Sequence, residues 1–266
     1  MTVALRTSAF GSLAVALVGV TAAAWLLRIQ LQLSPAFPAL VATAFIAVTL
    51  LAIGALARSA SERRPASAPA APRARPENRE ELTATVPAAH PFNRFGPANQ
   101  VTTVRAALVT IVAGLLFERP AAEVAAAAAA TASVATALDG LDGWLARRSG
   151  MSSAFGARFD LEVDALLIMA LAMFAWEHDK AGAWILLSGL LRYLFITGGL
   201  LWSWLQRPLP PSLRRQTICV VQILGLIVAV LPAVRPPLST AVAAVSLALL
   251  CYSFLVDTLW LWRNAP

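Results

Sequence analysis

The sequence predicts an all-α polytopic membrane protein in which a six-helix transmembrane core bundle follows a two-helix transmembrane hairpin. Hydrophobic residues make up 59% of the 266-residue chain and charged residues only 13%, and the mean hydropathy is +0.71. These values lie far from those of a soluble globular domain. The apolar residues are also gathered into long runs, each near the roughly 20 residues that a helix needs to cross a bilayer.

The first two runs, over 8–27 and 35–57, predict a hairpin that occupies residues 1–57. A signal peptide is the alternative for the first run, but the run is long and no clear cleavage site precedes Arg28, so we interpret it as a retained helix. Residues 58–90 are rich in Pro, Ala, Arg and Glu. Such a segment buries little apolar surface, and we expect a disordered or extended cytoplasmic linker.

The remaining residues, 91–266, form the predicted core. Within them the run at 124–137 is mostly alanine, and small side chains let helices approach closely in a lipid environment. Six apolar runs predict six spanning helices, at 101–117, 121–138, 155–176, 181–205, 217–234 and 238–262.

Arginine placement predicts the orientation of the chain in the membrane. The sequence pI is about 10.9 and Lys180 is the only lysine, so the basic excess comes almost wholly from arginine. In a membrane protein such an excess marks cytoplasmic loops rather than nucleic-acid binding. With six core helices, most arginines fall on the side that holds both termini and Arg147. We therefore expect a multi-pass protein of a bacterial cytoplasmic membrane with both termini and Arg147 facing the cytoplasm.

Four aspartates lie among the apolar runs between residues 139 and 164. An ionisable group at membrane depth is costly, so its default interpretation is a functional site that faces the bundle interior. Asp139 and Asp142 are three residues apart, which places them on one helix face, and Asp160 and Asp164, four apart, share another. Helices joined by a short turn can bring all four together, where cations would relieve their repulsion. Carboxylate oxygens suit Mg²⁺, Mn²⁺ or Ca²⁺.

The acids belong to a longer pattern, DxxDGxxAR-x8-GxxxDxxxD, whose eight specified positions are very improbable at these spacings by chance. This pattern resembles the signature of the CDP-alcohol phosphotransferases, also called CDP-alcohol phosphatidyltransferases, which are integral membrane enzymes that form the head-group linkages of phospholipids. The matching residues are Asp139, Asp142, Gly143, Ala146, Arg147, Gly156, Asp160 and Asp164.

The resemblance implies a transferase of phospholipid biosynthesis. It would move a phosphatidyl, or phosphoalcohol, group from a CDP-alcohol to the hydroxyl of a polar acceptor alcohol and release CMP. The implied cofactor is a two-metal site for Mg²⁺ or Mn²⁺, because this chemistry needs positioning and charge neutralisation. Asp164 is the implied general base and a further metal ligand beside Asp139, Asp142 and Asp160. The implied CDP pocket includes Gly143, Ala146, Arg147 and Gly156.

A second match lies upstream, where Asn99, Thr102 and Arg105 fit the family pattern NxxTxxR at the start of its first core helix. The spacing of three places these residues on one helix face. The resemblance implies that they bind the CDP moiety. A helix cap is the alternative for Asn99, because asparagine is a favoured N-cap residue.

Three further arginines are candidates for an acceptor site. Arg214 and Arg215 resemble the basic start of the fifth core helix in family members that use phosphorylated acceptors, and arginine suits phosphate. The positive-inside signal is the alternative for both. Arg192 lies well inside its predicted helix, where it either binds an acceptor phosphate or pairs with a carboxylate, for example Asp257.

The substrates stay open. Family members that make phosphatidylglycerophosphate often read LDPxADK around the last two acids, whereas this chain reads FDLEVDA, which weakens glycerol 3-phosphate as the acceptor. CDP-diacylglycerol is the preferred donor, and a soluble CDP-alcohol with a lipid acceptor is the alternative. Because the family often forms homodimers, we expect a homodimer.

Two other classes of function compete with a transferase. A membrane cation transporter would use the acidic cluster as its ion pathway, and a non-catalytic membrane scaffold would keep the acids as relics. A transport site gains nothing obvious from the planar, phosphate-binding fork of Arg147 beside its carboxylates. The complete signature argues against a scaffold, and metal-dependent CMP release distinguishes a transferase from both.

Overall fold

The computed structural model describes residues 3–61, 97–149, 154–207, 209–210 and 212–264, and the secondary structure within these ranges is helical, without a strand. This confirms the predicted all-α class. The predicted linker, 58–90, lies almost wholly outside the described residues. The α-helices are α1 (Val3–Leu31), α2 (Phe37–Ser61), α3 (Pro97–Leu115), α4 (Ala122–Ser149), α5 (Ala154–Glu177), α6 (Leu187–Leu201), α7 (Leu213–Val230) and α8 (Leu238–Arg263).

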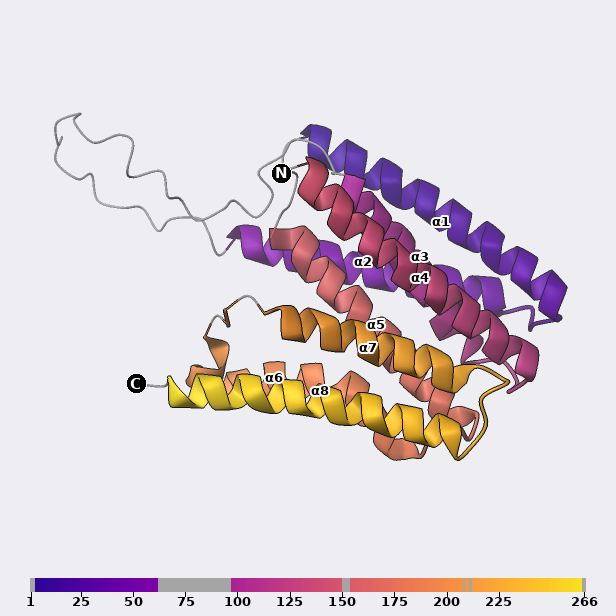
Figure 1. Cartoon of the computed structure of the whole chain (residues 1–266). Helices are drawn as coiled ribbons and strands as arrows, with labels where there is room; N and C mark the ends of the chain where they lie inside the picture. The colour runs from indigo at the N-terminus through magenta and orange to yellow at the C-terminus, as the bar shows by residue number, and fades with distance from the viewer. Residues whose placement is uncertain (1–2, 62–96, 150–153, 208, 211, 265–266) are drawn as a thin grey trace.

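Long apolar helices indicate an integral, multi-pass membrane protein. Five of the described helices are long and apolar enough to cross a bilayer, and they belong to α1, α4, α6, α7 and α8. The described apolar part of α2, Phe37–Leu51, is shorter. Polar and charged side chains interrupt the apolar character of α3 and α5, which also lie among other helices in Figure 1. The arrangement of two plus six spanning helices therefore stays a prediction.

One predicted helix differs from the structure. The run at 181–205 was expected to form a single helix, but it contains the short 3₁₀ helices Ala183–Leu186 and Ser203–Gln206 on either side of α6. Trp202, between α6 and the second of these, has extended backbone angles of φ −122° and ψ 106°. An apolar run specifies burial or lipid contact, and it does not reveal such a local change in backbone geometry.

The centre of the bundle consists of α3, α4, α5 and α7, in which α3 and α7 each pack against α4 and α5. The alanine-rich run lies on α4. One face of this run packs against neighbouring helices, since Ala125, Ala128 and Ala132 are fully buried. This agrees with the prediction that small side chains there allow close packing. Figure 1 shows α6 and α8 on one flank of this centre and α1 on the other.

The hairpin of α1 and α2 is attached to the core through α3. Phe37 and Val41 of α2 are fully buried, and both lie against Gly114 of α3. At the same end of the bundle, the Glu118 carboxylate accepts hydrogen bonds from the backbone N–H and the hydroxyl of Ser34, at 2.9 and 2.6 Å. Apolar packing and this two-point polar contact together fix the position of the hairpin beside the core.

The contact at Gly114 gives a prediction about stability. A Cβ atom at Gly114 would lie 2.7 Å from Val41 Cγ2, so Gly114→Ala requires α2 and α3 to move apart. Val41→Ala makes room for that Cβ. We expect the double variant to be more stable than the sum of the single effects by about 1 kcal/mol, measured by denaturant unfolding in detergent. Additive effects would show that the hairpin is not held through this contact.

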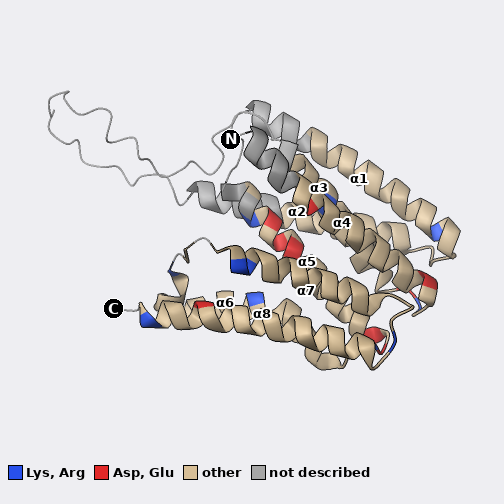
Figure 2. Cartoon of the chain, viewed as in Figure 1, with Lys and Arg blue, Asp and Glu red and all other residues tan. Residues whose placement is uncertain are grey.

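Charged residues are sparse along the helices, and an acidic group lies on α4 and α5 (Figure 2). The start of α1, the start of α7 and the end of α8 lie at one end of the bundle (Figure 1), and the acidic group lies in the same half. Arg214, Arg215 and Arg263 belong to this end as well. The fold thus brings the acids and a set of arginines to the same side.

Candidate active site

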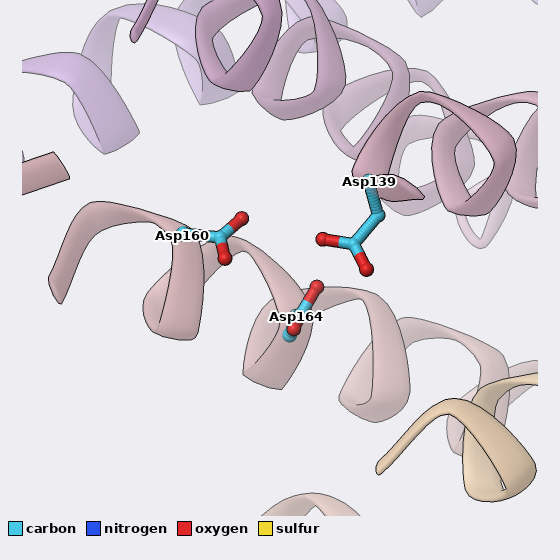
Figure 3. Close-up of side chains that lie close together, drawn as sticks. All are labelled: Asp139, Asp160 and Asp164. Carbon is cyan, nitrogen blue, oxygen red and sulfur yellow. The ribbon is translucent and has the colours of Figure 1, made fainter. Parts of the chain in front are cut away.

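Three of the four predicted acids converge between α4 and α5. Asp139 is on α4, and Asp160 and Asp164 lie one turn apart on α5, with all three side chains directed toward one another (Figure 3). One carboxylate oxygen from each lies within 4.8 Å of the others. The spacing of four explains the pair on α5, because residues i and i+4 share a helix face. Asp139 comes from the other helix, α4, so the cluster depends on how α4 and α5 lie relative to each other.

The guanidinium of Arg105, from α3, joins the three carboxylates. Its Nη1 is 2.8 Å from Asp139 Oδ1 and also contacts Asp160, and its Nη2 is 2.5 Å from Asp164 Oδ1. The Nε atom donates a 3.1 Å hydrogen bond to the carbonyl oxygen of Ala135 on α4. The Arg105 side chain is only 1% exposed. An arginine buried to this degree needs such partners, since an unpaired buried charge is strongly destabilising.

The position of Arg105 goes beyond the sequence prediction, which placed it only in the CDP pocket. Thr102 lies about one turn and Asn99 about two turns before it on α3, and both are buried. The helix begins at Pro97, so Asn99 lies inside its first turn and not at the N-cap. The three residues of the NxxTxxR match therefore start a buried helix face that ends in the acidic cluster. Whether they bind the CDP moiety stays a prediction.

The donor set of this cluster fits a divalent cation. Carboxylate oxygens are hard ligands of the type that Mg²⁺ and Mn²⁺ prefer. Three carboxylates and one guanidinium leave a formal charge of −2 on these four side chains, which one divalent cation would balance. The Asp139 and Asp160 side chains are 27% and 33% exposed, so an ion has access to the cluster. The Arg105 contacts keep the acids close together.

Several predicted residues lie on α4 beyond Asp139, where the structure describes the backbone and not the side chains. Their helical backbone runs to Ser149, which agrees with the predicted periodicity. Gly156 lies in the first turn of α5, one turn before Asp160. The roles predicted for these positions in metal or CDP binding stay predictions. The residues without described side chains are Asp142, Gly143, Ala146 and Arg147.

A residue that the sequence did not single out also borders the cluster. The thiol of Cys219, on α7, lies 3.9 Å from Asp164 Oδ2. The sequence placed this cysteine only in an apolar run, and its proximity to an acid 55 residues away depends on how α5 and α7 pack. No local pattern in the sequence signals such a contact.

The predicted acceptor arginines do not join the cluster in the described residues. Arg192 forms an ion pair with Glu162, on the neighbouring α5, so its suggested partner Asp257 is wrong. Asp257 instead pairs with Arg214 at 2.5 Å and Arg215 at 3.4 Å. The i, i+4 rule cannot choose between acids on different helices, which explains the error. Arg214 and Arg215 lie together at the start of α7, as predicted.

Comparison with known families decides the classification. The model of the CDP-alcohol phosphatidyltransferase family matches residues 96–253, which is more than half of the chain. The chain belongs to the CDP-alcohol phosphatidyltransferase family. The match includes α3 to α7 and most of α8, and therefore every site residue predicted above, whereas α1 and α2 precede it. Searches of curated proteins and of solved structures gave no significant match.

Membership of the CDP-alcohol phosphatidyltransferase family supports a transferase of phospholipid biosynthesis that uses a CDP-alcohol and an alcohol acceptor. A divalent metal is typical of the family, and the Asp139, Asp160 and Asp164 cluster can hold one. The family match and the apolar helices together place the reaction in an integral membrane protein.

Proposed function

We propose that the protein transfers a phosphatidyl group from CDP-diacylglycerol to the hydroxyl of a polar acceptor alcohol and releases CMP. The observation that carries the proposal is the convergence of Asp139, Asp160 and Asp164 around one buried guanidinium in a bundle of apolar helices. Carboxylates are seldom concentrated in this way inside a bilayer without a functional reason. Family membership supplies the reaction class.

The proposed ligands of Mg²⁺ or Mn²⁺ are Asp139, Asp142, Asp160 and Asp164. When bound, a pair of such ions neutralises the charge that develops on the transferring phosphate. In our proposal the chain itself orients the substrates. Asn99 and Thr102 bind the CDP moiety together with Arg105, which is already held in place by its hydrogen bond to Ala135. Gly143, Ala146, Arg147 and Gly156 shape the same pocket.

Asp164 is the proposed general base. Of the three clustered acids its side chain is the least exposed, at 14%, and it lies farthest into the bundle along α5. One Asp164 carboxylate oxygen contacts Arg105, and the other faces Cys219. This second oxygen is therefore the candidate atom that accepts the proton of the acceptor hydroxyl as the oxygen–phosphorus bond forms and CMP leaves.

Arg214 and Arg215 are the proposed acceptor-binding residues. They share one carboxylate, Asp257, so the group of three keeps a formal charge of +1. Both side chains are more than a quarter exposed, which leaves donors for a ligand phosphate. The ion pair of Arg192 with Glu162 makes Arg192 a weaker candidate.

The proposed organisation has a membrane hairpin at 1–57, a cytoplasmic linker at 58–90 and the transferase core at 91–266. The acids and the arginines at the same end of the bundle support a cytoplasmic active site under the positive-inside rule. A bacterial cytoplasmic membrane and a homodimer complete the proposal. A soluble CDP-alcohol donor with a lipid acceptor is the second candidate for the same site.

The test is CMP release by purified full-length protein over a matrix of donors and acceptors. CDP-diacylglycerol is tested with the polar acceptors glycerol 3-phosphate, inositol phosphate, inositol, serine and glycerol. Soluble CDP-alcohols are tested with a lipid acceptor, diacylglycerol. We expect acceptor-dependent CMP release when CDP-diacylglycerol is the donor and no release when the donor is a soluble CDP-alcohol. Release only with a soluble donor and a lipid acceptor would replace the proposed donor, and a cation transporter or a scaffold would give no release at all.

A further inference from the structure

An apolar groove is lined by side chains of α1 and α3. Figure 1 shows these two helices on the flank of the bundle where the hairpin packs. Its volume is about 710 Å³, which lies in the range of ligand-binding sites. One wall extends along α1 from Gly11 to Ala23, and the other extends along α3 from Gln100 to Ile111. Most of the lining is aliphatic, and Ser12, Gln100 and Thr103 contribute polar groups at one end of the groove.

Two glycines of α1, which have no side chain, keep the groove open. A Cβ atom added at Gly11 or at Gly19 would meet no other atom within 4 Å. On the opposite wall Ala107 is nearly buried, whereas Val104 is 46% exposed, so the groove opens sideways at the surface of the bundle. Because this surface faces lipid in a membrane protein, the natural occupant of the groove is hydrocarbon.

The groove adjoins the candidate active site through α3. Gln100 and Thr103 line the groove, and they directly follow Asn99 and Thr102 of the site. Successive helix residues are offset by about 100°, so the groove and the NxxTxxR match occupy neighbouring faces of one helix. The polar end of the groove therefore opens beside the place where a CDP head group is proposed to bind.

The length of the groove matches one leaflet of a bilayer. From Gln100 to Ile111 the wall on α3 rises by ~16 Å at 1.5 Å per residue, and one leaflet contributes about 15 Å of hydrocarbon. The polar end lies toward the active site and the apolar part leads into the membrane. This order is that of a glycerolipid with its head group at the site and one chain in the same leaflet.

We infer that the groove binds one acyl chain of the CDP-diacylglycerol donor, with α1 as its outer wall. The inference rests on the proposed function and gives the N-terminal hairpin a role in that function. Neither α1 nor α2 lies within the residues that match the family, so the outer wall is an addition of this chain to the shared core. A groove closed on one side by α1 selects for chain length, because a long chain reaches the Gly19 level and a short one does not.

The test uses a substitution that fills the inner half of the groove, together with two donors that differ in acyl-chain length. Gly19→Leu places a side chain into the open space, and Ala14→Leu adds the same side chain at an exposed position of α1 outside the groove. CMP release by the full-length protein is measured with CDP-dioleoylglycerol and with CDP-dioctanoylglycerol. For Gly19→Leu we expect the KM of the dioleoyl donor to rise about tenfold, as when about two methylene groups leave an apolar site.

Two KM values are expected to stay within about twofold of those of the wild-type protein: that of Gly19→Leu for the dioctanoyl donor and that of Ala14→Leu for either donor. The short chain does not reach the inner half of the groove, and Ala14 lies outside the groove. Equal effects of both substitutions, or equal effects on both donors, would overturn the inference and leave the proposed function intact. No CMP release by the wild type with either donor would overturn the proposed function and, with it, the assignment of the chain to the donor.

A second measurement does not depend on activity. CDP-diacylglycerol with a diazirine at the end of one acyl chain is photolysed with the wild-type protein, and the labelled peptides are identified. We expect label on α1 between Gly11 and Ala23. The amount of label is expected to decrease in Gly19→Leu and to stay unchanged in Ala14→Leu. Label spread evenly over the lipid-facing helices α6 and α8 would mean that the groove contains bulk lipid only.

Discussion

Arg105→Leu is expected to lower the free energy of unfolding by about 3–5 kcal/mol, because it leaves three clustered carboxylates without their buried counter-charge. The wild-type guanidinium contacts all three acids and is 1% exposed. Thermal unfolding in detergent with a chelator present measures the loss. Millimolar Mg²⁺ or Mn²⁺ is expected to restore part of it, because a divalent cation supplies positive charge to the same oxygens.

Arg158→Leu is the matched control for this substitution. Arg158 is an exposed arginine of α5, two residues before Asp160, and it has no ion pair among the described residues. We expect its effect to stay within about 0.5 kcal/mol, as for most surface substitutions. If Arg105→Leu unfolds at the temperature of this control in the presence of chelator, the guanidinium does not hold the acids together.

Asp164→Asn is expected to lower kcat for acceptor-dependent CMP release by about 10²–10⁴-fold, the usual contribution of a general base. Asparagine keeps the size of the side chain but cannot accept the proton of the acceptor hydroxyl. The KM for CDP-diacylglycerol is expected to change little at saturating metal, because the asparagine amide oxygen can still contact a metal ion and binding of the CDP moiety is assigned to other residues. Steady-state CMP release at saturating metal separates the two parameters.

Glu162→Gln is the control for Asp164→Asn, because Glu162 is an acid of the same helix that pairs with Arg192 and not with the cluster. We expect it to keep kcat within a few-fold of the wild type. A loss in Glu162→Gln as large as that in Asp164→Asn would show a general sensitivity of α5 to lost charge. A tenfold or smaller effect of Asp164→Asn would remove it as the base.

The sequence was sufficient to predict that Asp160 and Asp164 lie close together, because their arrangement is local. The spacing of four that places Asp160 and Asp164 on one face needs only the geometry of a helix. The all-α class follows from hydropathy in the same way. The convergence of Asp139 with this pair needs one further assumption, a short connection between two helices, and the separation of α4 and α5 agrees with it.

Contacts between helices that are distant in the chain could not be predicted in this way. Arg192 pairs with Glu162 and not with Asp257 because α5 and α6 pack together. The placement of Arg105 at the centre of the acids depends equally on how α3 meets α4 and α5. The position of Arg192 inside an apolar helix predicted either an acceptor phosphate or an acidic partner, but nothing in the sequence specified which acid.

The central claim is that the cluster of α4 and α5 performs a metal-dependent transfer that releases CMP. The most direct measurement is CMP release by purified full-length protein with CDP-diacylglycerol and the acceptor panel, before and after metal removal by a chelator. Our account predicts release that requires an acceptor, stops with the chelator and returns with added Mg²⁺ or Mn²⁺. Release that persists without any divalent metal, or no release with any donor and acceptor, would contradict it.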